Sequence, residues 1–466
     1  MQINELENKK ILILGLGREG LVTAKFLRKH YPGIKLGMAD ARDILAFDLE
    51  TQKLLEDSSK YTLHLGKDYL SVLNDYQVVI KTPGLSPYLK EIKEAQQAGV
   101  VLTSATRLFF ANRVGKIIAI TGSKGKSTTS SLIYQVLKAG GKDVELVGNI
   151  GKSALEYLDQ DGPNKLFVFE ISSYQLMDLE ESPDVAVLVS FFPDHLDYHG
   201  SLDEYFRCKM NLVNHLKAGA KVVYNVGSER INQFVGDRLG KRTDIELIGF
   251  NDGLGSRVEG AAAWVGGEKL VDLSEVKLIG EHNLQNMLAA EAVGKIFEID
   301  RTVIVSALKE FKGLEHRLEF VGKYRGINFY NDAISTTPES TIAGIEALKA
   351  SGIGTLFVGG MDRGYQFKKL AEKILEVGIK NIIIFPDTGA QIWHEIEQCA
   401  TDQKLNLPKH FEVNKMDEAV KIAYEETEKG TICLLSNASP SFNLFKNYED
   451  KGRQFKENVV RIGSIV

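Results

Sequence analysis

The chain has 466 residues, too many for one hydrophobic core, which predicts two to four domains. Its 44% hydrophobic and 26% charged residues are typical of a globular protein and exclude a disordered, fibrous or membrane chain. A formal net charge of -5 argues against nucleic-acid binding, which usually needs a basic surface. Three scattered cysteines fit a reducing cytosol, and the first apolar run is too short for a signal peptide or membrane span. We therefore expect a cytoplasmic protein that binds neither nucleic acid nor membrane.

The first region alternates short apolar runs with glycine turns and helical patterns. A strand at 10–14 enters the turn GLGREG (15–20), and a helix follows it. Two more strands are expected in KLGMAD (35–40), which ends on Asp40, and in YQVVIKTPG (76–84). This order predicts βαβ units and a parallel sheet.

The second region starts near residue 113 and the third near 314. In the second, strands are expected at 116–121, 166–173 and 185–192, shorter strands between 225 and 280, and a helix over 282–297. In the third, each of four strands enters a turn: 327–333, 355–362, 381–387 and 431–437. The predicted fold class is α/β with three domains. They are a Rossmann-like domain (1–112), a central P-loop ATPase-type domain with a parallel sheet (113–314), and a Rossmann-like carboxyl-terminal domain (315–466).

A phosphate-binding loop is the strongest local signal. An apolar strand is followed by Gly-Ser-Lys-Gly-Lys-Ser-Thr (122–128) and then directly by a helical pattern. Glycines let backbone N–H groups converge on phosphate oxygens, and the helix N-terminus favours negative charge. Lys126 can reach the β- and γ-phosphates and Ser127 can ligate Mg²⁺. Ile120 stands where the ordinary motif has its first glycine, so the loop is compressed. The alternative is a glycine turn with a chance Lys-Ser pair.

Ten segments in order carry a resemblance to a known family. They are GLGREG, GSKGKST, GNIG (148–151), EISSYQL (170–176), DHLDYHGS (194–201), GEHNLQN (280–286), EHRLE (315–319), ND (331–332), GGMDRG (359–364) and SNASPSFNLFKNYEDKG (436–452). The chain resembles the Mur ligase family, and within it the glutamate-adding branch. This implies an ATP-consuming, ADP-forming ligase, a monomer, that adds glutamate to UDP-N-acetylmuramoyl-L-alanine through an acyl phosphate. A sister Mur ligase or a folylpolyglutamate synthase, which shares the compressed loop, is the alternative within the class.

The resemblance implies roles for residues at the ATP site. ATP would be bound by Gly122, Ser123, Lys124, Gly125, Lys126, Ser127, Thr128, Asn286, Arg317 and Asp332. Mg²⁺ would be held by Ser127, Glu170, His195 and Lys209, the last as a carbamate made from CO₂. Catalysis is assigned to Lys126, His195 and Lys209. The alternatives without a role in ATP or metal binding are a solvent-facing Glu170, a structural His195, a surface Lys209 and a surface ion pair at Arg317.

The first glycine turn admits two interpretations. GLGREG with Asp40 downstream matches the dinucleotide fingerprint and by itself suggests an NAD-dependent oxidoreductase. In the family this turn holds the uridine diphosphate of the sugar nucleotide. The implied contacts are Arg18, Glu19, Asp40, Arg42, Gly84 and Asn149. A catalytically dead sugar-nucleotide-binding module is a further alternative, disfavoured because Lys126, Ser127, Glu170 and His195 are present.

The amino-acid site is expected on the third domain, at Thr336, Arg363, Ser441 and Tyr448. Arg363 and Tyr448 stand where the family usually has lysine and phenylalanine. Ile334 replaces a lysine found in most D-glutamate-adding members, and a related subgroup with Thr-Thr-Pro here includes enzymes that act on L-glutamate. D-glutamate is therefore the default, L-glutamate stays open, and Ile334 as a neutral loop change is equally allowed. Because the substrate groups are spread over three domains, the third is expected to close on ATP.

Overall fold

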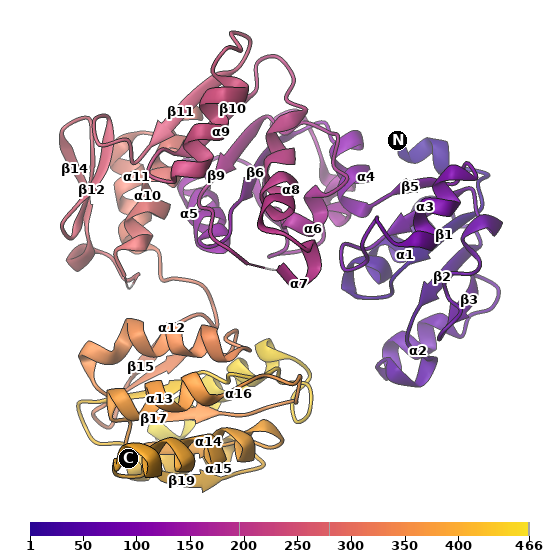
Figure 1. The fold of residues 1–466 in the computed structure, drawn as a ribbon. Helices are drawn as coiled ribbons and strands as arrows, with labels where there is room; N and C mark the ends of the chain where they lie inside the picture. The colour runs from indigo at the N-terminus through magenta and orange to yellow at the C-terminus, as the bar shows by residue number, and fades with distance from the viewer. Residues whose placement is uncertain (195, 279, 465–466) are drawn as a thin grey trace. The chain divides into compact units, whose positions relative to one another are not determined.

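The computed structural model describes residues 1–194, 196–278 and 280–464 and forms two compact units. The first unit comprises Met1–Val276 with Glu281–Phe311, and the second comprises Lys277–Gly280 with Lys312–Val466 (Figure 1). Each unit is an α/β structure with its own sheets. No helix in the described ranges is long and apolar enough to cross a membrane.

The amino-terminal part of the first unit is a five-stranded parallel sheet. Its strand order is β3-β2-β1-β4-β5. The strands are β1 (Ile11–Leu14), β2 (Leu36–Asp40), β3 (Tyr61–Leu65), β4 (Val78–Lys81) and β5 (Val101–Thr103), and the helices are α1 (Arg18–His30), α2 (Leu49–Leu55), α3 (Lys90–Gln97) and α4 (Ala105–Asn112). All residues of β1 and β4 are buried, as expected for parallel strands covered on both faces.

A six-stranded parallel sheet forms the centre of the first unit, in the order β11-β10-β9-β6-β8-β7. Its strands are β6 (Lys116–Thr121), β7 (Val144–Gly148), β8 (Leu166–Glu170), β9 (Val185–Leu188), β10 (Lys221–Asn225) and β11 (Glu246–Phe250). The helices are α5 (Lys126–Ala139), α6 (Ser173–Leu176), α7 (Leu196–His199), α8 (Leu202–Asn214), α9 (Glu229–Leu239), α10 (His282–Ile296) and α11 (Arg301–Glu310). A small antiparallel sheet follows: β12 (Ser256–Glu259), β13 (Ala262–Val265) and β14 (Glu268–Asp272). The polar stretch between 225 and 280 thus holds short strands, as predicted.

Helix α4 joins the two parallel sheets of the first unit. Phe109 meets Phe167 of β8 edge-to-face at 4.9 Å between ring centroids, and Phe110 meets Phe169 at 5.4 Å. These rings belong to one buried cluster that also contains Ile11 and Ile13 of β1. Aromatic burial of this size contributes strongly to stability, so the two sheets share a hydrophobic core.

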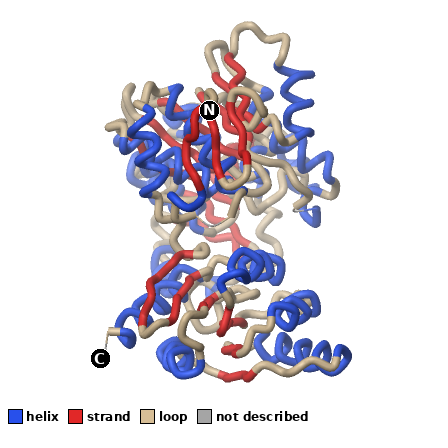
Figure 2. Tube along the Cα trace, turned by 90° about the vertical axis from the view of Figure 1, so that its left-hand side faces the viewer, coloured by secondary structure: helices blue, strands red, loops and turns tan. Residues whose placement is uncertain are grey.

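The second unit contains one mixed sheet, in the order β15-β16-β20-β17-β18-β19. Its strands are β15 (Glu319–Tyr324), β16 (Ile327–Asn331), β17 (Ile353–Val358), β18 (Asn381–Ile384), β19 (Lys409–Glu412) and β20 (Ile432–Leu435), and its helices are α12 (Pro338–Leu348), α13 (Lys368–Val377), α14 (Thr388–Gln403), α15 (Met416–Glu426) and α16 (Tyr448–Gly463). Only the β15–β16 pair is antiparallel. Alternate residues of β17 enter two different cores, one packed on α12 to α14 and one on α15 and α16. Figure 2 shows the strands in red with blue helices around them.

The α/β class is confirmed, and each strand expected from an apolar run before a glycine or polar turn is present. The strands β3, β5, β7, β10, β15 and β19 were not predicted, because they are short and only partly apolar. Short 3-10 turns complete the chain at Ile3–Leu6, Ile44–Ala46, Leu73–Asp75, Ala154–Gln160, Leu273–Glu275 and Lys349–Ser351. The boundaries at 112 and 314 stay a prediction.

Candidate active site

The compressed glycine loop lies between β6 and α5. Gly125 caps the helix with φ of 85°, a left-handed conformation that favours glycine, and α5 begins at Lys126. The Lys126 ammonium donates to the carbonyl oxygens of Gly122 (2.8 Å) and Ser123 (3.0 Å), so the side chain lies back along the loop. The first N–H groups of a helix have no partner within the helix. Helix start, loop and lysine together form an anion site suited to phosphates.

Of the other loop residues, some hold the loop in place and others are exposed to solvent. The Ser123 hydroxyl donates to the carbonyl of Phe192 at 2.8 Å and accepts from its N–H at 2.9 Å, which ties the loop to the chain after β9. Lys124 is exposed and lies 3.3 Å from Asp194. Ser127 is half-buried and Thr128 is buried. The predicted phosphate-loop residues are therefore gathered at one place.

Asn286 of α10 lies directly against the loop. It accepts a hydrogen bond from Thr129 of α5 at 3.1 Å and donates to Asn283 at 2.9 Å, and it is buried. A Cβ on Gly125 would come within 2.5 Å of its Oδ1 atom. Asn286 thus supports the loop in this structure, and its contact with adenine stays a prediction.

Lys209 of α8 is buried at the same loop, only 2% exposed, which rules out the alternative of a surface lysine. Its Nζ atom donates to the Gly122 carbonyl at 2.7 Å and lies 4.5 Å from the centre of the Tyr205 ring. Burial, and then the positive charge of Lys126, lower the pKa of Lys209 to about 6. The amine is therefore mostly neutral at neutral pH.

Glu170 ends β8 and is 2% exposed, so it does not face solvent. One carboxylate oxygen accepts from the Asn149 amide at 3.4 Å, and the Asn149 N–H donates to the Glu170 carbonyl at 3.0 Å. The other oxygen is buried and has no hydrogen-bond partner among the described residues. Buried polar atoms are normally paired, so this oxygen is suited to a ligand such as a cation. His195, predicted as a further metal ligand, lies outside the described residues.

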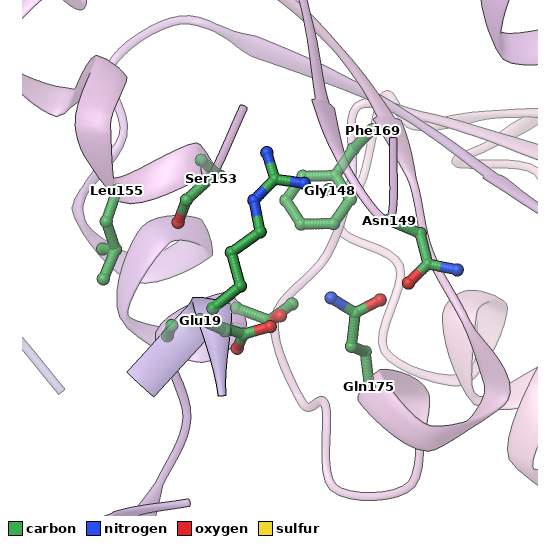
Figure 3. A pocket seen from close by; sticks show the side chains of 11 residues that line it. Glu19, Gly148, Asn149, Ser153, Leu155, Phe169 and Gln175 are labelled. Carbon is green, nitrogen blue, oxygen red and sulfur yellow. The ribbon is translucent and has the colours of Figure 1, made fainter. Parts of the chain in front are cut away.

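A cavity of about 180 Å³ lies between α1 and the chain after β7 (Figure 3), and Asn149, whose amide donates to Glu170, is one of the residues that line it. Arg18 and Glu19 line it from the GLGREG turn, and Asn149 lines it from the other side. The guanidinium of Arg18 donates to the carbonyl of Gly151 at 2.6 Å. Three residues predicted to hold the sugar nucleotide therefore share one cavity. Gln175 and Ser153 also line it and were not predicted as site residues, although Gln175 lies in the quoted segment EISSYQL.

Asp40 and Arg42 form a hydrogen-bonded ion pair at the end of β2. The carboxylate accepts the Leu16 N–H at 2.7 Å and two N–H groups of the Arg42 guanidinium at 2.9 and 3.0 Å. Burial acts to raise the pKa of Asp40, but the Arg42 and Leu16 hydrogen bonds outweigh it and hold this pKa below its ordinary value. Gly84, the remaining residue predicted at this site, is exposed, and its neighbour Pro83 accepts a hydrogen bond from Tyr198 at 3.3 Å.

In the second unit, Asp332 follows β16 and is buried. Its carboxylate accepts from the Ser436 hydroxyl at 2.8 Å and from the Leu318 N–H at 3.2 Å. Burial raises the pKa of Asp332 to about 6. Arg317 is exposed, and its positive charge acts on this carboxyl. Nucleotide contacts by Asp332 and Arg317 stay predictions.

The four residues predicted to bind the amino acid occupy loops or a helix start that follow β16, β17 and β20. These strands are parallel neighbours, so their carboxyl ends share one edge of the sheet. Thr336 is half-buried after β16, Arg363 is exposed after β17, and Tyr448 begins α16. Ser441, after β20, is buried, and its hydroxyl has no partner among the described residues. The structure brings the four to one edge, while their contacts with a substrate stay a prediction.

Fold and loop geometry define a nucleotide-binding α/β protein with a P-loop. Three family models match the chain: Mur ligase MurD-like, N-terminal domain (residues 9–104), Mur ligase middle domain (120–294) and Mur ligase, glutamate ligase domain (316–438). The chain belongs to the Mur ligase family. This membership decides against the NAD-dependent oxidoreductase alternative.

Relatives named UDP-N-acetylmuramoylalanine--D-glutamate ligase are similar over nearly their whole length. The relative from Ruminiclostridium cellulolyticum is 32% identical and the one from Acetivibrio thermocellus 33%, each over 98% of this chain and 97% of the relative. The Streptococcus agalactiae relative is 32% identical over 97% of both chains. Two solved structures from Thermotoga maritima share the fold. The UDP-N-acetylmuramate-alanine ligase MurC has a TM-score of 0.58 at 18% identity and covers 98% of this chain and 100% of its own. The MurF ligase in complex with ADP has a TM-score of 0.55 at 16% identity, over 99% of this chain and 97% of its own.

Proposed function

We propose that this chain is an ADP-forming ligase that joins D-glutamate to UDP-N-acetylmuramoyl-L-alanine. The observation that carries the proposal is the P-loop at the start of α5, with Lys126 and the buried Lys209 both bonded to the Gly122 carbonyl. The name shared by relatives about one-third identical over nearly the full chain supports the choice of substrates. ATP, the UDP-sugar and glutamate are the proposed partners, and a cytoplasmic monomer is the proposed state.

The reaction transfers the γ-phosphoryl group of ATP before the amide bond forms. A carboxylate oxygen of the UDP-sugar substrate bonds to the γ-phosphorus, and the bond to the β,γ-bridging oxygen breaks, which yields ADP and an acyl phosphate. The amine of glutamate then attacks the acyl carbon, loses a proton, and expels phosphate. Both reacting partners of the first step are anions, so positive charge and backbone N–H donors at the loop lower the barrier. Lys126 would leave its loop carbonyls and neutralise the β- and γ-phosphates.

The residues around Glu170 fit a magnesium ion. Ser127 and Glu170 would hold it, since Mg²⁺ is usually bound by one or two carboxylates together with phosphate oxygens. In the described ranges no three His, Cys, Asp or Glu side chains cluster in a way that could hold a metal ion. When bound, the ion would supply Lewis-acid neutralisation of the transferring phosphoryl group.

We further propose that Lys209 carries a carbamate. A neutral amine attacks the carbon of CO₂, a nitrogen–carbon bond forms, and one N–H proton leaves to solvent. The lowered pKa of Lys209 supplies the neutral amine, and the nitrogen keeps one hydrogen that can still donate to the Gly122 carbonyl. The modified side chain is an anion that can ligate a metal ion, whereas an ammonium would repel it.

The test is a panel of amino acids, D- and L-glutamate included, scored by ADP and phosphate release with ATP, magnesium and UDP-N-acetylmuramoyl-L-alanine. We expect release that requires both the UDP-sugar and D-glutamate. Release with L-glutamate alone would favour the second candidate, the L-glutamate-adding variant, which the replacement of lysine by Ile334 keeps open. No release with either form of glutamate would overturn the proposal.

A further inference from the structure

The second unit contains a lysine that is completely buried and serves no role described so far. Lys451 lies in the first turn of α16 and is 0% exposed. Its ammonium donates to the carbonyl of Gly359 at 3.0 Å. It lies 4.3 Å from the centre of the Phe385 ring and 5.3 Å from that of Phe445. An ammonium over aromatic faces is attracted by their negative potential.

The ammonium of Lys451 has no charged partner among the residues that the structure describes. Burial alone lowers the pKa of Lys451 to about 7, so about half of the side chains carry the charge at neutral pH and more do below it. Within the described ranges no charged side chain acts on it, and the adjacent Asp450 pairs with Arg453 instead. An unpaired charge in an apolar interior is unfavourable, and methionine or leucine would fill similar space without that penalty. A buried lysine at this position therefore calls for a functional reason.

The contacts of Lys451 lead to the loops that carry the proposed glutamate-binding residues. Gly359 is the first residue after β17 and begins the loop that contains Arg363. The N–H of Gly359 donates to the Asn437 carbonyl at 2.8 Å, which joins this loop to the one after β20. Phe445, whose ring lies near the ammonium, donates its N–H to the Ser441 carbonyl at 3.1 Å. Lys451 thus contacts the loop after β17 at Gly359 and the loop after β20 at the Phe445 ring.

Two polar groups in the same loops have no partner among the described residues. They are the Ser441 hydroxyl and the Oδ1 atom of Asn437, and both side chains are at most 1% exposed. A hydroxyl can donate to a carboxylate, and an amide oxygen can accept from an amine. Because buried polar groups are normally paired, these two are suited to the ends of an amino acid.

We propose that Lys451 is a specificity-determining cation of the amino-acid site, whose charge next to the two loops favours a dicarboxylic amino acid. The inference rests on the proposed function, because it names what distinguishes glutamate from a neutral amino acid at that same site. Lys451 acts through the loops rather than by touching the reacting atoms. Low-dielectric surroundings strengthen its field because little water screens it.

The test compares three variants in steady-state kinetics with ATP, the UDP-sugar and glutamate. K451M and K451Q remove the charge, and K451Q keeps a hydrogen-bond donor for Gly359; K451R keeps the charge. We expect the KM for glutamate to rise on the order of tenfold in K451M and K451Q, with kcat and the KM for ATP within about twofold of wild type. K451R should restore most of the glutamate affinity. K451M should also unfold at a temperature no lower than that of wild type, because it removes an unpaired buried charge.

Lys456 gives a matched control on the same helix. Lys456 is paired with Glu315 and Glu319, so K456M removes a positive charge from α16 while Lys451 stays in place. The KM of K456M for glutamate should therefore equal that of wild type. A wild-type KM for glutamate in both K451M and K451Q would overturn the inference. A raised KM in K451M with a wild-type KM in K451Q would also overturn it, because the effect would then belong to the hydrogen bond and not to the charge. If none of the three variants folds, Lys451 is a structural residue and the inference also fails. A wild-type enzyme that forms no ADP with glutamate contradicts the proposed function itself, and is assayed first.

Discussion

A methyl group added at Gly125 tests the geometry of the phosphate loop. Gly125 has φ of 85°, where an L-residue is disfavoured by about 1–2 kcal/mol. Its Cβ would also lie 2.5 Å from Oδ1 of Asn286 and 3.1 Å from Cγ1 of Val189. Asn286 cannot move aside freely, because it is buried and bonded to Thr129 and Asn283. Breaking these two hydrogen bonds would add about 1 kcal/mol each.

Gly141 provides the matched comparison just beyond the other end of α5. Its φ is 73°, and a Cβ there would meet nothing within 4 Å. Gly141→Ala therefore carries the backbone penalty alone, whereas Gly125→Ala carries the penalty and the clash. We expect Gly125→Ala to lose about 3–4 kcal/mol of unfolding free energy and Gly141→Ala about 1–2 kcal/mol. Replacing glycine by alanine also lowers the conformational entropy of the unfolded chain. This effect is the same in both variants and cancels in the comparison.

Urea unfolding measures the stability difference, and calorimetric titration with ATP and magnesium measures binding. ATP affinity should fall at least about tenfold, or about 1.4 kcal/mol, in Gly125→Ala and stay unchanged in Gly141→Ala. Equal losses of stability in the two variants, together with wild-type ATP affinity in both, would refute the assignment of Gly125 and Asn286 to a packed phosphate loop.

Three further outcomes follow from the first unit. Lys126→Ala should abolish ADP formation yet keep UDP-sugar binding in a titration, because Lys126 does not line the cavity of Arg18 and Asn149; parallel loss of both would count against separate sites. Lys209→Ala should lose most activity and regain part of it when short-chain acids are added. No rescue of the variant, together with undiminished turnover of the wild-type enzyme at limiting bicarbonate, would contradict the carbamate. Burial, opposed by the charge of Lys81, raises the pKa of Glu19 from 4.5 to about 7. Between these two pH values Glu19 is protonated in the folded protein and ionised in the unfolded chain. Wild type should therefore lose stability relative to Glu19→Gln as the pH rises from 4.5 to 7, with no further change above that window in urea unfolding; a pH-independent difference would contradict the buried carboxyl.

Local sequence was sufficient for the elements that carry the phosphate site. A fully buried parallel strand is a continuous apolar run, and a turn with left-handed backbone needs glycine, so β6, Gly125 and the start of α5 could be predicted from neighbouring residues. The same reasoning found β16, β17, β18 and β20, each of which ends in a polar turn. It passed over the edge strands β5 and β19, whose exposed residues weaken the apolar pattern.

Only the tertiary structure decided which groups are buried together. Lys209 is 87 residues from Gly122, Asn286 is 157 from Thr129, and Lys451 is 92 from Gly359, yet each pair is joined by a hydrogen bond. Sequence periodicity shows that a face is buried but not what covers it. The sequence alone therefore determined the fold class, the loop and the family resemblance. Packing decided that Lys209 and Glu170 are buried, that one Glu170 oxygen has no partner among the described residues, and that Lys451 is a cation enclosed by aromatic rings, because desolvation depends on every neighbour in space.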